Sequence, residues 1–293
     1  MARKPELGKW LLYRFFARNL SARKHLPTTR KYNEKALAAM LQAYGAVYIK
    51  PAAGSRGRGV MKVWKRQGRV IVQHTVHKPI AFSTLGEACT YIKRLQGDRV
   101  YIVQQAVHLL HVQGRPMDVR VMMQRERPGG KWLYSGMVAK VAGPHSIVTN
   151  VALSRGAVMS VDRALRQAGW TTEQTERMKA RLIELAHEWA KHFDTYQPYR
   201  ELGFDIAIDT RGRIWLLEEN TGPSHRLFAK SIDGRADYRR IQDRWRRYER
   251  ARRSSGLHAR STPTAGPSGR TRGCQGAPRP RVNDRGTVSP GTY

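Results

Sequence analysis

Apolar side chains recur every three or four residues in three stretches of the chain, the spacing that places them on one helix face. The first predicted helix begins after Asn33, a residue suited to capping, and runs through Tyr44. The second begins at the capping-box sequence that starts at Thr84 and runs to about Leu95. The third begins at Thr171, and we expect it to be the longest helix of the chain. Its apolar stripe consists of Met178, Leu182, Leu185, Trp189 and Phe193.

Runs rich in β-branched and aromatic residues, separated by turn residues, predict strands between these helices. We expect strands at 47–49, 60–64, 100–105, 119–124, 132–141, 205–209 and 214–220. Turns rich in Gly, Pro and Arg separate the strands within two of the pairs, at 127–130 and 210–213. Helices and strands in this order predict an α+β fold of two lobes with a cleft between them.

A glycine-rich loop joins the first two predicted strands. It follows Lys50 and runs through Gly54, Ser55, Arg56, Gly57, Arg58 and Gly59. Because a strand follows the loop where a helix would be needed, it is neither a P-loop nor a dinucleotide fingerprint. Glycines let backbone N–H groups approach phosphate oxygens, and arginine matches phosphate geometry. The loop therefore indicates a phosphate-binding hairpin or an ordinary glycine-rich hairpin, and the spacing alone leaves both open.

Three oxygen-bearing side chains gather on the last two predicted strands. Glu218 and Asn220 lie two residues apart, so they point to the same face of their strand. Asp205 lies on the preceding strand, and an antiparallel hairpin would bring it close to them. Mg²⁺ prefers such oxygen ligands and often bridges carboxylates to substrate phosphates. These residues are therefore candidate metal ligands, although polar residues that merely face solvent would give the same pattern.

At this point several motifs, in order along the chain, resemble the ATP-grasp superfamily, and within it the YheC/YheD family, described as endospore coat-associated. The likeness runs from about residue 7 to residue 230. The residues that carry it are Lys50 with its glycine loop, Asp118-Val119-Arg120, Asn150, Asp205 and Glu218-Glu219-Asn220. The stretches Leu7-Gly8-Lys9-Trp10, His25-Leu26-Pro27-Thr28-Thr29, Met137 to Pro144 and Ile147 to Asn150 add to it.

The resemblance implies an ATP-grasp fold, in which ATP lies in the cleft between two α+β subdomains. It implies that Lys50 contacts the α-phosphate and adenine region, and that the loop from Gly54 to Gly59 closes over the phosphates. The residues implied to read adenine and ribose are Gln104, Gln105 and Val107 of the hinge strand, and His108 directly after it. His108 stands where the family pattern has an acidic residue for the ribose hydroxyls.

The resemblance also implies a reaction. A family member would activate a carboxylate as an acyl phosphate, which an amine or a thiol then attacks. Arg120, Lys140 and Asn150 are the implied catalytic residues. Asp205, Glu218 and Asn220 would hold Mg²⁺, or Mn²⁺ in its place. The implied partners are a small-molecule or peptide carboxylate, an amine acceptor and spore-coat proteins. Such an enzyme works mainly by positioning two anionic reactants and neutralising their developing charge.

Charge and composition divide the chain further. Of the net charge of +32, residues 234–293 contribute +11, from 15 Arg and 4 Asp or Glu, so the preceding part carries +21. Such a positive field attracts ATP, acidic molecules and, non-specifically, other polyanions. We expect an N-terminal segment at 1–26, subdomains at 27–110 and 111–233, a basic amphipathic helix at 234–253 and a disordered basic tail at 254–293. The tail lacks the large apolar side chains that would offset the entropy of ordering.

Other site classes find little support in the sequence. Cys89 and Cys274 are too few and too far apart for a disulfide framework or a zinc site. No segment approaches the roughly 20 apolar residues of a membrane-spanning helix, and the run from Trp10 to Phe16 is too short for a signal-peptide core. We expect a cytoplasmic protein, with a link to the spore coat if the resemblance holds.

Two alternatives to an active ligase stay open. His108 and the short segment before the first subdomain, which lacks a full N-terminal domain, favour a catalytically quiet nucleotide-binding coat or scaffold protein. The overall positive charge would also suit a nucleic-acid-binding protein whose glycine loop is incidental.

Overall fold

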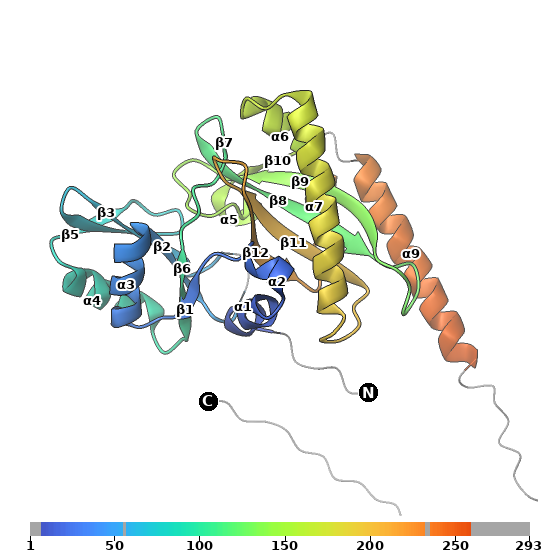
Figure 1. Cartoon of the computed structure of the whole chain (residues 1–293), viewed down its shortest axis with the longest axis horizontal. Helices are drawn as coiled ribbons and strands as arrows, with labels where there is room; N and C mark the ends of the chain where they lie inside the picture. Colours follow the sequence, from blue (N-terminus) through green and yellow to red (C-terminus); the bar gives the residue numbers. More distant parts are fainter. Residues whose placement is uncertain (1–6, 55–56, 232–234, 259–293) are drawn as a thin grey trace, which may run out of the picture.

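The computed structural model describes residues 7–54, 57–231 and 235–258 of the chain, and the side chains up to Ser255. Two antiparallel sheets form the molecule, one in each half (Figure 1). The first sheet has the strand order β1-β6-β2-β3-β4-β5. Its strands are β1 (Thr29–Lys31), β2 (Ala46–Pro51), β3 (Met61–Arg66), β4 (Arg69–His74), β5 (Ile80–Phe82) and β6 (Tyr101–Gln105). Helices α3 (Glu34–Tyr44) and α4 (Leu85–Gln96) pack against it around their own apolar core.

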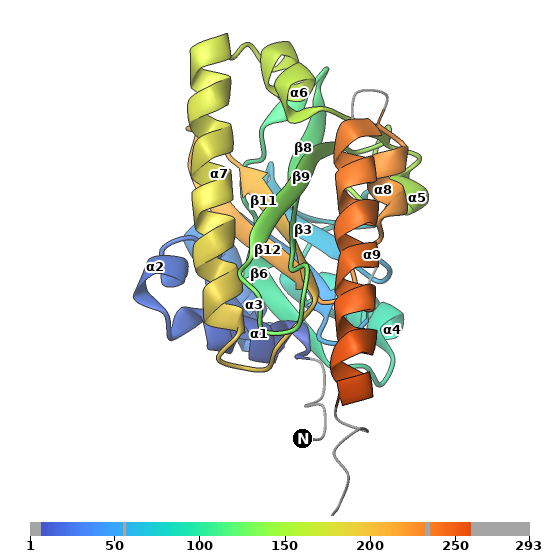
Figure 2. The ribbon, with the colours of Figure 1, turned by 90° about the vertical axis from the view of Figure 1, so that its right-hand side faces the viewer.

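The second sheet has the order β10-β9-β8-β11-β12, with β7 paired to β8. Its strands are β7 (His111–Val112), β8 (Arg115–Gln124), β9 (Leu133–Val141), β10 (Ala157–Met159), β11 (Glu201–Ile208) and β12 (Ile214–Asn220). Helices α6 (Val161–Gln167) and α7 (Thr172–Phe193) cover one face, and α8 (Arg226–Ala229) and α9 (Arg235–His258) cover part of the other (Figure 2). Three further helices are α1 (Lys9–Ala17), α2 (Leu20–Arg23) and α5 (Val151–Ser154).

The predicted α+β class is confirmed, and the helix starts follow the capping residues of the sequence. Asn33 accepts a hydrogen bond from the backbone N–H of Ala36 at the start of α3. At the start of α7, Thr171 and Gln174 form the complete reciprocal capping box. At the start of α4 the box is incomplete, because the Glu87 carboxylate accepts from the N–H of Ser83.

One expectation about helix length is wrong. Helix α7 has 22 residues, whereas α9 has 24 and runs on past Arg253 to His258. Sequence periodicity undervalued α9 because it buries little besides Ile241. Ion pairs between residues three apart support its exposed length instead, among them Arg246–Asp243 and Arg252–Glu249. The expected tail from residue 259 onward lies outside the described residues. Within the described part of the chain, no helix is both long and apolar enough to span a membrane.

Candidate functional site

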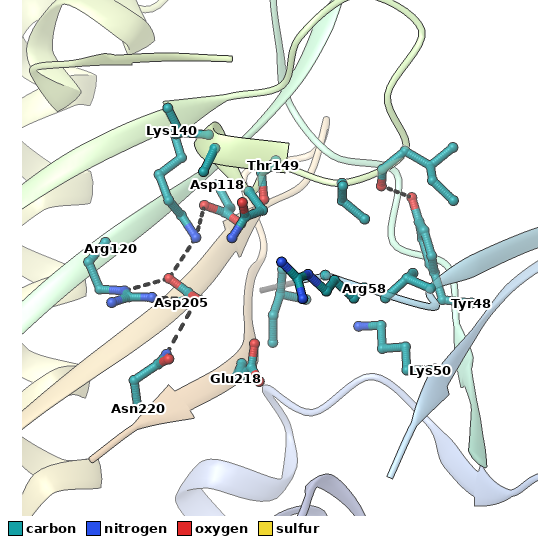
Figure 3. A pocket seen from close by; sticks show the side chains of 18 of the residues that line it. Tyr48, Lys50, Arg58, Asp118, Arg120, Lys140, Thr149, Asp205, Glu218 and Asn220 are labelled. Carbon is teal, nitrogen blue, oxygen red and sulfur yellow. Dashed lines mark hydrogen bonds and ion pairs between the residues drawn. The ribbon is translucent and has the colours of Figure 1, made fainter. Parts of the chain in front are cut away.

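A cavity of about 670 Å³ opens between the two sheets. Its first wall comes from β2, β6 and the glycine loop, and its second from β8, β9, β11 and β12. The segments 147–152 and 222–230 complete the lining. Figure 3 shows Lys50 and Tyr48 on the first wall facing Arg120, Lys140 and Asp205 on the second. Residues far apart in the sequence therefore meet in one space.

Strand register builds the second wall. In β8, Arg120 pairs with Asp205 of β11, and Asp118 pairs with Lys140 of β9. Asp118 and Arg120 lie two residues apart, so both point to the cavity face of the sheet. Arg120 donates to both oxygens of Asp205, through Nε at 2.6 Å and Nη2 at 2.8 Å. Lys140 Nζ lies 2.8 Å from Asp205 Oδ1 and 3.0 Å from Asp118 Oδ1 (Figure 3).

These four side chains, which we call the buried network, are almost removed from solvent, at 3% exposure for Asp118 and 8% for Arg120. Burial opposes the charge on Asp205, but the neighbouring Arg120 and Lys140 outweigh it and hold the pKa of that carboxyl well below its usual range. Burial raises the pKa of Asp118, and the negative Asp205 adds to the effect although Lys140 opposes it. Asp205 is thus the carboxylate that both cations depend on.

Strand β12 brings two further oxygen ligands to the same space. The register pairs Glu218 with Asp205, and a bulge after that pair aligns Leu216 with Ile206. Leu217 is therefore the extra residue, and it lines the cavity together with Glu218. Asn220 lies with its amide nitrogen 3.4 Å from Asp205 Oδ2. The expected common face of Glu218 and Asn220 is present despite the bulge.

Lys9, at the start of α1, joins the two halves at the cavity. Its Nζ lies 3.1 Å from Glu218 Oε1 and donates to the carbonyl oxygen of Gly54 at 2.6 Å. Its backbone N–H donates to Ala52 O at 2.8 Å. Gly8 is required for this approach, because a Cβ there would lie 2.9 Å from the same carbonyl oxygen. One side chain thus links the glycine loop to the strand of Glu218.

Lys50 dominates the first wall. Its Nζ donates to Gln104 Oε1 at 2.6 Å, and Gln104 in turn donates to the hydroxyl of Thr29 at 3.0 Å. Burial lowers the pKa of Lys50 to about 8, although the charge of Glu218 opposes that shift. The ammonium remains mostly protonated at pH 7 and is held at the edge of the cavity by a fixed amide.

The segment 147–150 connects the walls. The hydroxyl of Tyr48 on the first sheet donates to Ile147 O at 3.3 Å, and Thr149 donates to the carboxylate of Asp118. Asn150 accepts from the N–H of Leu153 at 2.9 Å and so begins α5. Its side chain therefore has a structural partner as well as a place on the cavity wall.

Most of the residues singled out in the sequence line this cavity. They are Lys50, Gly54, Gly57, Gln104, Gln105, Val107, Arg120, Lys140, Asn150, Asp205, Glu218 and Asn220. Gly59 and His108 do not: Gly59 packs beside Pro51 and Tyr101, and the His108 side chain is exposed away from the lining. Ser55 and Arg56 lie outside the described residues.

Sequence reasoning gave no role to three residues that matter here: Lys9, Asp118 and Thr149. For Asp118 a signal existed, because it stands two positions before Arg120 and directly before the predicted strand 119–124, so it shares the face of Arg120 when that strand begins earlier, as β8 does. For Lys9 no local signal existed, since its partners Gly54 and Glu218 are distant in sequence.

The side chains present suit a hard divalent cation only in part. Glu218 and Asn220 offer oxygens to the cavity, and the Lys9 ammonium beside Glu218 shows that a cation is accommodated there. Both oxygens of Asp205 already accept from Arg120, so its role as a metal ligand stays a prediction that requires one donor to move. In the described parts of the chain, no three His, Cys, Asp or Glu side chains are placed to hold a metal. A metal here would also need phosphate oxygens.

Comparisons with known proteins identify a matching family model and similar proteins. A family model described as "YheC/D like ATP-grasp" matches residues 2–250. The endospore coat-associated protein YheD of Bacillus subtilis (strain 168) is 26% identical over 231 residues, which are 77% of this chain and 50% of YheD. The endospore coat-associated protein YheC of the same organism is 24% identical over 229 residues, 74% of this chain and 60% of YheC. The chain thus spans about half to three fifths of these relatives.

One similar solved structure is the C-terminal domain of K. lactis Pby1, an ATP-grasp enzyme, which is 16% identical to this chain. The match covers 77% of this chain and 68% of the Pby1 chain, with a TM-score of 0.46. The ATP-grasp ligase PsnB, complexed with minimal precursor, is 13% identical with a TM-score of 0.44 over 77% of this chain and 56% of that one.

Proposed function

The chain belongs to the YheC/D-like ATP-grasp family, and on that premise we propose that it binds ATP with Mg²⁺ in the cavity and joins a carboxylate to an amine or thiol. The observation that carries this proposal is the buried network. It fixes two cations on the wall opposite Lys50 and the glycine loop, so a polyphosphate placed between the walls would meet positive charge on both sides.

The nucleotide would use both walls. The backbone of the hinge at Gln105 and Val107 would read adenine, and the Lys50 ammonium, already aimed by Gln104, would contact the phosphates. Gly54 and Gly57 would let the loop backbone approach those phosphates closely. Glu218, Asn220 and Asp205 would hold the metal, which when bound neutralises phosphate oxygens in the transition state.

The reaction would proceed in two balanced steps. An oxygen of the substrate carboxylate attacks the γ-phosphorus of ATP, the bond to the β-phosphate oxygen breaks, and acyl phosphate and ADP result. The nitrogen of the amine then attacks the acyl carbon, the bond from that carbon to the phosphate oxygen breaks, and amide, phosphate and a proton result. Arg120 and Lys140 would stabilise the charge that develops on the transferred group, and Asp205 orients both.

A second candidate is favoured by a specific observation. Both oxygens of Asp205 accept hydrogen bonds from Arg120, and Lys9 pairs with Glu218, so these two carboxylates have cationic partners without a metal. A nucleotide-binding protein without turnover would suit this arrangement. The names of YheD and YheC support the accompanying proposal that this chain acts at the spore coat.

Hydroxylamine separates the two candidates, because it replaces the amine and converts an acyl phosphate into a stable hydroxamate. The assay supplies Mg-ATP, hydroxylamine and a pool of acidic di- and tripeptides, and measures ADP and hydroxamate together. The ligase proposal expects equal amounts of both, lost in Arg120→Met. ATP binding without either product would favour the quiet protein.

A further inference from the structure

The charge of the cavity exceeds what a nucleotide and one carboxylate would balance. Seven Lys or Arg side chains and three carboxylates line its described part, a surplus of four positive charges (seven minus three). A magnesium–ATP complex carries a net charge of about −2 at neutral pH, because its phosphates are ionised. A surplus of about two positive charges therefore remains for whatever else the cavity holds.

The surplus is localised, because most of the cations already have partners. Arg120 and Lys140 form salt bridges with carboxylates of the buried network, and Lys9 forms one with Glu218. In the parts of the chain that the structure covers, four lining cations form no salt bridge with a carboxylate: Lys50, whose Nζ donates to Gln104, and Arg58, Arg226 and Lys230. Arg58 belongs to the glycine loop, where a phosphate is expected. Arg226 and Lys230 belong to neither the loop nor the hinge.

Arg226 and Lys230 stand together at one place on the wall. Arg226 begins α8 and Lys230 is its C-cap, four residues later, so both side chains lie on one side of the short helix. Leu227 beside them also lines the cavity. Behind α8, Phe228 packs on Met122 and Val138 of the second sheet, which fixes the helix in position.

This place adjoins the reacting end of the proposed site. The turn that leads from Asn220 to α8 passes directly over Gly203, where an added Cβ would lie 2.7 Å from Pro223 Cβ and 3.2 Å from Arg120 Cδ. Gly203 thus allows Pro223 to pack beside Arg120. The segment from Asn220 to Lys230 therefore begins beside Arg120, where the proposed phosphoryl transfer would occur, and carries Arg226 and Lys230 at its far end.

We propose, resting on the ATP-dependent function above, that Arg226 and Lys230 form a subsite for an acidic co-substrate. Besides the carboxylate that reacts, this co-substrate carries at least one more anionic group, which the two cations bind. An acidic peptide has this chemistry. The subsite requires no covalent step of its own, because it holds the second group while the first lies near Arg120.

The test uses triglutamate as the probe and triglutamine as its neutral counterpart, added to the full chain in the presence of excess Mg²⁺ and a non-hydrolysable ATP analogue. The variant Arg226→Ala/Lys230→Ala removes the subsite. The control Arg239→Ala/Arg250→Ala removes the same charge from the exposed side of α9, where neither arginine lines the cavity. Binding is measured by calorimetry, and circular dichroism checks that each variant folds.

The proposal expects triglutamate to bind more tightly than triglutamine, and its Kd to rise at least about tenfold in the subsite variant while the control changes it less than about twofold. Equal loss in both variants, or equal binding of the two peptides, overturns it. The analogue's own Kd separates this result from the proposed function. If the analogue binds and the peptides do not differ, only the acidic subsite fails. If the analogue does not bind but the subsite effect persists, only the nucleotide function fails.

Discussion

Replacing Asp205 by Asn tests whether the buried network is organised as the structure indicates. Arg120 donates to one Asp205 oxygen at 2.6 Å and to the other at 2.8 Å, and Lys140 approaches the first at 2.8 Å. The amide of Asn must therefore turn an N–H₂ toward a cation, and a buried positive charge loses its counterion. Removing one partner of a buried pair costs about 3–5 kcal/mol, so we expect the free energy of unfolding to fall by that amount.

Asp118→Asn is the matched control. Asp118 is as buried as Asp205, but one of its oxygens only forms an ion pair with Lys140, at 3.0 Å, and the other accepts from the Thr149 hydroxyl. An Asn can keep the first contact with its oxygen and donate to the hydroxyl oxygen with its N–H₂. The raised pKa of Asp118 also indicates that this site tolerates a neutral group. We expect a loss below about 1 kcal/mol, within the range of ordinary substitutions.

The assay is urea unfolding of both variants at pH 7, followed by fluorescence and circular dichroism. Equal losses in the two variants would refute the reasoning, because they would show that Asp205 is no more central than Asp118. The pH dependence gives a second readout. Because the folded pKa of Asp205 is lowered, its contribution is complete above the unfolded value of about 3.9 and is lost as the pH falls below it. The difference between wild type and Asp205→Asn should shrink over that acid range.

Three further predictions follow from single contacts. Because the pKa of Lys50 is about 8, its ammonium loses its charge between pH 7 and pH 9, and the Kd for ATP measured by calorimetry should rise over that range in wild type. The rise should be smaller in Lys50→Arg, and parallel profiles would contradict a phosphate-binding role for Lys50. Gly203→Ala should destabilise the fold by about 1–3 kcal/mol in urea unfolding, whereas Gly222→Ala, with open space around it, should change it little; equal effects would contradict the close packing at Gly203. Lys9→Met should leave the free energy of unfolding within about 1 kcal/mol of the wild-type value, since the ion pair of Lys9 is partly exposed. The same variant should weaken Mg-ATP binding severalfold, and unchanged binding would exclude Lys9 from the site.

Local signals in the sequence accounted for much of the fold. The capping residues Asn33 and Thr171 marked true helix starts, because a side-chain acceptor at a helix N-terminus acts over only three residues. The alternation of side chains along a strand placed Glu218 and Asn220 on one face, because this alternation is also a local property of the chain. The bulge at Leu217 gave no such signal, since it arises from pairing between strands.

The electrostatic state of the site could not be predicted from the sequence. Asp205 was expected as a metal ligand from its residue type, but its partners Arg120 and Lys140 are set by the order of three strands in the sheet. Lys9 reaches Glu218 only because α1 is fixed against Ala52 by a close backbone approach at Gly8. The exposed His108 side chain likewise depends on how the chain leaves β6. Contacts between segments far apart in the sequence determine each of these arrangements, so a local sequence pattern does not predict them.

The measurement that tests the central claim most directly is the thermal shift of the protein with ATP, with and without Mg²⁺, in wild type and Glu218→Gln. A ligand at about a hundredfold over its Kd stabilises the folded state by roughly 2.7 kcal/mol, which raises the midpoint by several degrees. We predict a shift in wild type that requires Mg²⁺ and disappears in Glu218→Gln. An unshifted wild type, or a shift of the same size in the variant, would contradict a magnesium–ATP site between the two sheets.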